Sequence, residues 1–253
     1  MPTTINLSDT PNSSKPSSAK PTSEIAANNL SRAQSGRVHR TYGIRKTHII
    51  CVIDKSSSMH SIRDHAIAGF NAFLREQQLL GQPAILSLVL FDTQVRTIMN
   101  QVPLASAQPL SPDDYVPGGG TALLDALGAV LVNPTRQKSD QTIVVILTDG
   151  QENSSVEHTR QAVKSAISAL EKTGQWQFQF LGANIDAFAE AGKLGLSFKH
   201  TADAGRMKPA AMQAMLSAAS MNTRHFRETG DMLALHCLVT EELAHAENRL
   251  QAH

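Results

Sequence analysis

The sequence has no long hydrophobic run, few cysteines and almost no net charge. Its longest purely aliphatic stretch, "IVVIL" at 143–147, is far shorter than the ~20 residues needed to span a bilayer, so we expect no transmembrane helix. The first twenty residues contain no apolar block that would form the core of a signal peptide, so we expect no export by that route and a cytoplasmic location. A length of 253 residues with 41% hydrophobic residues suits one globular core plus a tail.

The two cysteines lack the spacing of metal ligands, which excludes a zinc-finger type of site. Cys51 falls in an expected buried strand and Cys237 in the apolar segment "LALHCLV". In a reducing compartment such residues are usually core thiols, so we expect neither a disulfide nor cysteine chemistry.

The small net charge hides an asymmetry along the chain. Residues 1–46 contain seven Lys or Arg and two acids, which leaves sixteen bases and twenty acids for the rest. Residues 1–40 are also rich in Ser, Pro, Thr and Asn, a composition that buries too little apolar surface to offset chain entropy, so we expect a disordered basic tail. The cluster "RVHRTYGIRK" offers nucleic-acid binding as an alternative function, but it has no aromatic platform or fold behind it and favours a solvated linker.

From Thr47 onward, short apolar runs rich in β-branched residues alternate with segments of helical period, which predicts an α/β fold with a largely parallel sheet. Only "FDTQ" (91–94) separates the second and third expected strands. A parallel crossover needs a dozen or more residues, so this pair must be an antiparallel hairpin. The expected strands are 47–53, 84–91, 95–99, 142–148, 178–183 and 196–200, and the expected helices are 60–80, 122–132, 156–172, 187–194, 208–226 and 231–250.

Three polar clusters follow expected strands or open expected helices: "DKSSS", "YVPGGGTALLDA" and "LTDGQEN". In open α/β sheets ligands bind outside the carboxyl ends of the strands, where these clusters should meet. Their side chains offer oxygen donors without imidazole or thiolate, which suits a hard divalent ion and argues against zinc or copper. We therefore predict a magnesium site, with manganese and calcium as alternative ions, formed by Asp54, Ser56, Ser58, Thr121 and Asp149.

Each cluster also has a purely structural interpretation. Ser57 or Ser58 would cap the first helix, Asp149 would begin an ordinary turn, and residues 118–120 would form a flexible loop. The metal interpretation is preferred because three such coincidences at the same edge of one sheet would have to arise independently.

These motifs resemble those of von Willebrand factor A (vWA) domains. "DKSSS" is similar to the Asp-x-Ser-x-Ser motif of that family, "GGGTALLDA" to its threonine loop and "LTDG" to its second aspartate. The resemblance extends over roughly residues 46–230, followed by a C-terminal helical extension at 231–253. The segment 180–196 looks like the small bacterial intracellular branch of the family. The resemblance implies a Rossmann-like, six-stranded sheet with one antiparallel edge strand and helices on both faces.

The resemblance also implies a metal-ion-dependent adhesion site. Ser56 and Ser58 would bind the ion directly, Asp54 and Asp149 directly or through water, and Thr121 would join when a partner engages. Two carboxylates leave the ion electrophilic, so its open position should attract an Asp or Glu of a partner protein. Related bacterial proteins serve as adaptors in multiprotein systems, which implies an ATPase or stress-response complex as the partner.

An enzyme is the rival interpretation. A magnesium-dependent phosphatase of the haloacid dehalogenase type needs a second Asp two residues after the first, where this chain has Ser56. His60 and His65 lie five residues apart, on different faces of the expected helix, and are interpreted as surface residues. We therefore expect a binding module without catalytic activity, and no membrane or nucleic-acid partner.

Overall fold

The computed structural model describes residues 46–131, 139–183, 185–203 and 209–251, the last range without all of its side chains. The tail expected at residues 1–40 lies outside the described residues. The described helices contain no segment long and apolar enough to cross a membrane.

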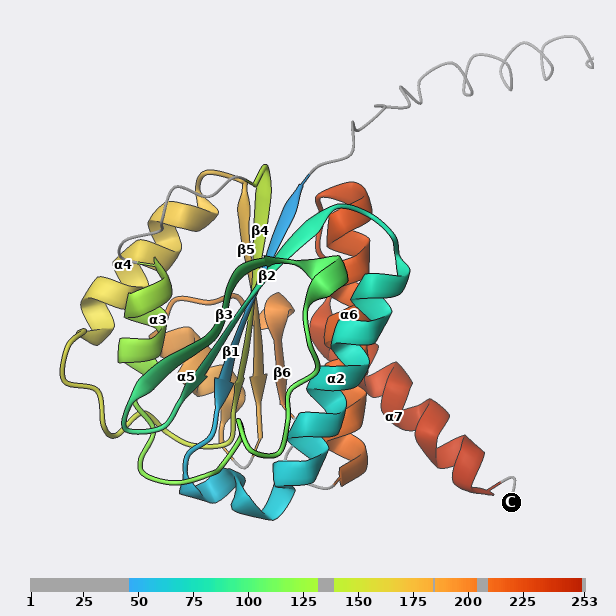
Figure 1. Ribbon diagram of the computed structural model, residues 1–253, viewed down its shortest axis with the longest axis horizontal. Coiled ribbons are helices and arrows are strands. Elements are labelled where there is room, and N and C mark those ends of the chain that lie inside the picture. Colours follow the sequence, from blue (N-terminus) through green and yellow to red (C-terminus); the bar gives the residue numbers. More distant parts are fainter. Residues whose placement is uncertain (1–45, 132–138, 184, 204–208, 252–253) are drawn as a thin grey trace, which may run out of the picture. The chain divides into compact units, whose positions relative to one another are not determined.

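A single six-stranded sheet forms the centre of the fold (Figure 1), with strand order β3-β2-β1-β4-β5-β6. The β2 and β3 strands pair antiparallel and every other neighbouring pair is parallel. This confirms the hairpin inferred from the short "FDTQ" link, with β3 at the edge of the sheet. The strands are β1 (Thr47–Asp54), β2 (Ala84–Phe91), β3 (Val95–Pro103), β4 (Gln141–Thr148), β5 (Trp176–Gly182) and β6 (Thr201–Asp203).

Helices cover both faces of the sheet, because β1, β2 and β4 are buried at every position. Residues 49, 51 and 53 of β1 belong to one hydrophobic cluster, and residues 50 and 52 belong to another. Figure 1 shows α2, α6 and α7 over the first face and α3, α4 and α5 over the second. The helices are α2 (Arg63–Leu79), α3 (Leu123–Leu131), α4 (Arg160–Glu171), α5 (Ala187–Lys193), α6 (Pro209–Thr229) and α7 (Leu235–Gln251).

Short 3-10 helices displace two of the expected elements. The last strand is Thr201–Asp203, whereas residues 198–200 of the segment expected to be that strand form a short 3-10 helix that Ser197 caps through its hydroxyl. The segment after β1 opens as a 3-10 helix, η1 (Ser57–Ile62), before α2 begins at Arg63. A hydrophobic stripe does not distinguish these two helix types, which explains the expected start at His60.

The helix expected from Val156 begins four residues later, at Arg160. The hydroxyl of Thr159 accepts a hydrogen bond from the Ala162 N–H and so caps the helix. Cys51 is a buried free thiol as expected, and burial raises its pKa to about 12. Cys237 is also free, but it is exposed, so its interpretation as a core thiol was wrong.

Buried amide groups connect α6 to the sheet and to α2. Gln77 donates to the carbonyl and hydroxyl of Ser220 at 3.0 and 2.9 Å. Gln179 of β5 donates to Thr223 Oγ1 at 2.9 Å. Arg227, which is 5% exposed, donates to the Gln77 carbonyl at 2.8 Å, and its burial lowers its pKa to about 10. The long helix is therefore held by directional bonds as well as by its Ala and Met side chains.

Candidate metal site

The polar clusters meet at the carboxyl ends of β1 and β4. These two strands are parallel neighbours, and Ile53 lies opposite Leu147, so Asp54 and Thr148 end side by side. The next strand in the sequence, β2, pairs with one edge of β1, whereas β4 pairs with the other edge. This is the point at which the strand order reverses, where open α/β sheets bind ligands.

Three of the predicted oxygen donors lie in direct contact. Ser56 Oγ is 3.1 Å from Ser58 Oγ, and Ser58 Oγ donates to Asp149 Oδ1 at 2.6 Å. Ser56 is 2% exposed and Asp149 is 4% exposed. Residues from two separate loops thus bring hydroxyl and carboxylate oxygens to one place at the edge of the sheet.

The serine hydroxyls do not cap the helix that follows. Ser56 is the N-cap residue of η1, yet its side chain makes no capping hydrogen bond. The Ser57 hydroxyl donates to the Gly119 carbonyl at 2.9 Å, and the Ser58 hydroxyl donates to Asp149. The structural interpretation of these residues as helix caps therefore does not describe their contacts.

Asp54 is fully buried at the centre of this edge. Its Oδ1 accepts from the Ser56 N–H at 2.7 Å and its Oδ2 from the Thr148 hydroxyl at 2.6 Å. Burial raises the pKa of Asp54 to about 6, and the neighbouring negative charge of Asp149 adds to the increase despite the hydrogen bonds from Thr148 and Ser56. Two buried carboxylates whose charges repel one another favour a cation nearby.

Thr121, which is 2% exposed, approaches from the loop before α3. Its N–H donates to Asn153 Oδ1 at 2.9 Å, and its carbonyl accepts from the Asn153 N–H at 3.1 Å. A Cβ at Gly150 would lie 2.7 Å from Thr121 Oγ1, so that hydroxyl lies against the residue that follows Asp149. Thr121 is thus placed beside the Asp149 loop.

The β2–β3 turn holds the glycine loop in place. The Gly120 N–H donates to Thr93 Oγ1 at 2.9 Å, and the Ala122 N–H donates to the Asp92 carbonyl at 2.8 Å. Lys55, within the first motif, forms an ion pair with the Asp92 carboxylate. The hydroxyl of the fully buried Tyr115 donates to the Asp54 carbonyl. Burial and then the charge of Asp54 raise the pKa of this tyrosine, so it remains a hydrogen-bond donor.

The donor set fits a hard divalent ion. At the ~2.1 Å metal–oxygen distance of magnesium, neighbouring octahedral ligands are about 3 Å apart. The 3.1 Å between Ser56 Oγ and Ser58 Oγ and the 2.6 Å between Ser58 Oγ and Asp149 Oδ1 bracket that spacing. Among the described residues no group of three or more His, Cys, Asp or Glu side chains suits a metal ion.

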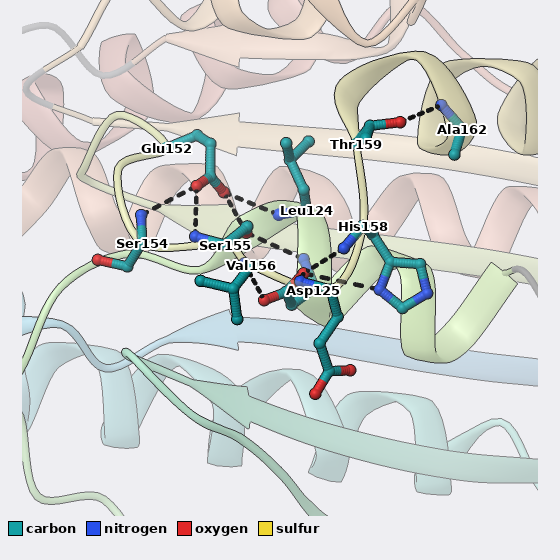
Figure 2. Close-up of polar contacts among 10 residues, drawn as sticks. Leu124, Asp125, Glu152, Ser154, Ser155, Val156, His158, Thr159 and Ala162 are labelled. Atoms are coloured by element: carbon teal, nitrogen blue, oxygen red, sulfur yellow. Dashed lines mark hydrogen bonds and ion pairs between the residues drawn. The ribbon is translucent and has the colours of Figure 1, made fainter.

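Several residues of this site were missed by sequence reasoning. Thr148 and Tyr115 orient Asp54, and Asn153 binds the backbone of Thr121. Glu152 and Asp125 organise the loop after β4 (Figure 2). All five lie within the polar clusters "YVPGGGTALLDA" and "LTDGQEN". Nothing in their spacing shows that they bond across the site, because those contacts form only when distant loops meet.

Comparison with solved structures shows the same fold in proteins of low sequence identity. The vWF domain of the type V pili tip protein Mfa5 from Porphyromonas gingivalis gives a TM-score of 0.58 at 13% identity, covering 75% of this chain and 99% of that one. The PilB minor pilin from Streptococcus sanguinis gives 0.56 at 13% identity, covering 74% of this chain and 63% of that one. The ArnB paralog VWA2 from Sulfolobus acidocaldarius gives 0.50 at 18% identity, covering 68% and 44%.

This chain therefore spans less than two thirds of the pilin and of the ArnB paralog. No curated protein matches the sequence. The model of the family described as "VWA domain containing CoxE-like protein" matches residues 27–173, which is more than half of the chain. With its six-stranded sheet and the vWA folds of its structural neighbours, the chain belongs to this family of vWA domain proteins.

Proposed function

We propose that this protein is a metal-dependent binding module that captures an Asp or Glu side chain of a partner protein through Mg²⁺. The observation that carries the proposal is the run of oxygens from Ser56 through Ser58 to Asp149, with spacings of 3.1 and 2.6 Å. These hydroxyls are not used as helix caps, so their arrangement calls for another explanation.

The chemistry of the donors supports capture of an external acid. Asp54 and Asp149 would balance the two positive charges of the ion, and Ser56, Ser58 and Thr121 would add only neutral oxygens. When bound, the ion supplies a Lewis-acidic position for a carboxylate. Ser58 is the accessible residue of the set, because it is exposed whereas Asp54 is fully buried. A partner would therefore approach from the Ser58 side.

Isothermal titration calorimetry with MgCl₂ tests the metal site. Ser58→Ala removes a proposed ligand, and Ser57→Ala is the matched control because its hydroxyl bonds to the Gly119 carbonyl instead. We expect saturable binding by the wild type, at least about tenfold weaker binding by Ser58→Ala, and little change for Ser57→Ala. Equal affinities for all three proteins, or no uptake by the wild type, would contradict the proposed site.

Capture of a partner is tested by pull-down from the native host. We expect the same protein to be recovered by the wild type with Mg²⁺ and lost when the ion is chelated or Thr121 is replaced by Ala. Recovery unchanged by both treatments would remove the metal bridge. Deleting residues 1–40 should leave this capture intact, whereas nucleic-acid affinity carried by the basic tail would disappear with its salt dependence.

A magnesium-dependent hydrolase is the alternative function. Against it, such an enzyme needs a second Asp two residues after Asp54, where this chain has Ser56. We expect no hydrolysis of an aryl phosphate in the presence of Mg²⁺. Hydrolysis that Asp54→Ala abolishes would establish the enzyme instead.

The finer assignments remain proposals of the same kind. They are Mg²⁺ rather than Mn²⁺ or Ca²⁺, an ATPase or stress-response complex as partner, and the cytoplasmic bacterial branch of the family. The ion is the simplest to test, by repeating the calorimetric titration with each of the three metals.

A further inference from the structure

Glu152 binds the beginning of α3 from the opposite loop. Its Oε2 accepts from the Leu124 N–H at 2.9 Å and from the Ser155 hydroxyl at 2.7 Å. Its Oε1 accepts from the backbone N–H groups of Ser154 and Ser155 at 3.0 and 2.9 Å. Figure 2 shows this carboxylate between the two chain segments. One side chain thus satisfies a free N–H of the first helical turn and also shapes its own loop.

Asp125 makes the reciprocal connection from α3 to the loop. Its carboxylate accepts from the N–H groups of Val156, Glu157 and His158 at 2.8, 2.9 and 2.7 Å (Figure 2). Its own N–H donates to Ser155 Oγ at 3.1 Å. Each segment therefore supplies hydrogen-bond partners to the other.

The connected segments carry two of the proposed metal ligands. Thr121 comes three residues before Leu124, and Asp149 comes three residues before Glu152. Between these points, Asn153 exchanges two hydrogen bonds with the backbone of Thr121. A change at Glu152 would therefore be transmitted to Thr121 through Leu124 on one side and Asn153 on the other.

We propose that Glu152 is a positioning residue that fixes the Thr121 hydroxyl for the metal site. The inference rests on the proposed function and adds a role for a residue that is not a ligand. The negative charge at the amino end of α3 is favourable in its own right. The connection to Thr121 distinguishes a positioning role from that of an ordinary helix cap.

The test compares Glu152→Gln with Glu157→Gln. Both variants remove one negative charge from the same loop, but Glu157 is exposed and Glu152 is partly buried with four hydrogen-bond donors around it. An amide cannot accept on both sides, so Glu152→Gln leaves donors of one segment unpaired. We expect about tenfold weaker Mg²⁺ binding by Glu152→Gln, as for other outer partners of metal ligands, and no change for Glu157→Gln.

Two further measurements separate positioning from general stabilisation. Without metal, amide exchange at residues 118–126 should be faster in Glu152→Gln than in the wild type or Glu157→Gln. In a double-mutant cycle, Glu152→Gln should add less than about a twofold loss of Mg²⁺ affinity once Thr121 is already Ala. Asn153→Ala removes the exposed side chain that accepts from the Thr121 N–H, and it should also weaken Mg²⁺ binding. This variant takes the place of Glu152→Gln if Glu152→Gln folds poorly.

The outcomes distinguish this inference from the proposed function. No Mg²⁺ uptake by the wild type overturns the proposed function. Uptake by the wild type that Glu152→Gln and Asn153→Ala leave unchanged overturns the positioning role alone. Full additivity with Thr121→Ala also overturns it, because Glu152 would then act independently of that hydroxyl.

Discussion

Ser58 joins the two halves of the proposed metal site, with its hydroxyl 3.1 Å from Ser56 Oγ and 2.6 Å from Asp149 Oδ1. The motif spacing placed all three residues at strand ends, which was sufficient to predict that they would come together. The sequence could not predict that Thr148 and Tyr115 would bind Asp54, because a hydroxyl near a strand end has many partners within reach. Such contacts depend on the exact approach of two loops.

Asp125 gives a pH-dependent prediction at a single side chain. Burial alone would raise its pKa, but three backbone N–H groups and the neighbouring His158 outweigh that effect and lower it. A lowered pKa stabilises the fold above the unfolded-state value of about 3.9, and this contribution is lost as the pH falls through the folded-state pKa. Asp125→Asn should therefore lower the free energy of unfolding at pH 7, with a smaller difference in acid.

Urea unfolding at pH 7 and at about pH 3 measures this difference. Asp113→Asn is a suitable control, because Asp113 is exposed on a different loop. A deficit of Asp125→Asn that is the same at both pH values would show that the charge of Asp125 does not matter.

Among the elements, the central strands followed the sequence more closely than the last strand, which lies outside the segment expected to form it. Continuous apolar runs bounded by polar residues marked β1, β2 and β4 to within one residue of their observed ends. The beginnings of α2 and α4 were placed too early, because local hydrophobic spacing does not report a 3-10 turn or a tertiary cap. Residues 156–158 have a helix-like sequence, but Asp125 binds their N–H groups in a loop.

Gly182 allows a close approach between β5 and α5. A Cβ there would lie 2.4 Å from Ala187 Cβ and 3.0 Å from its Cα, and backbone cannot give way as a side chain can. Gly182→Ala should lower the free energy of unfolding by ~1–3 kcal/mol, as overpacking does.

Gly192→Ala is the matched control, because nothing lies within 4 Å of a Cβ at that position of α5. Alanine is also the better helix former. Chemical denaturation of the two variants compares them directly. Equal stability of Gly182→Ala and the wild type would show that β5 and α5 separate at little cost.

For the whole molecule, the strand order explains why the proposed ligands meet at one edge of the sheet. The motifs are separated by dozens of residues, but β1 and β4 are neighbours and their carboxyl ends coincide. The alternation of strands and helices was enough to predict the fold class. It did not determine how α6 is seated, since the buried bonds of Gln77 and Gln179 to that helix involve residues with no distinctive spacing.

Metal binding should stabilise the entire fold, because the unfolded chain has no assembled site. At a Mg²⁺ concentration one hundred times the dissociation constant, the free energy of unfolding should rise by about 2.7 kcal/mol. Urea unfolding with Mg²⁺ and with chelator measures the increase, which Ser57→Ala should retain and which tenfold weaker binding by Ser58→Ala would reduce to about 1.4 kcal/mol. An identical increase in both variants would place the stabilising ion elsewhere.

The attachment of α6 limits how this domain can change shape. A surface of alanine and methionine would tolerate a helix sliding along its axis, since such side chains repack easily. The buried polar side chains would not tolerate such a slide. A shift by one turn would separate the donors of Gln77, Gln179 and Arg227 from their acceptors, which are Ser220, Thr223 and the Gln77 carbonyl. Any rearrangement that begins at the sheet edge must therefore carry α6 and α2 along as one body or break those bonds first.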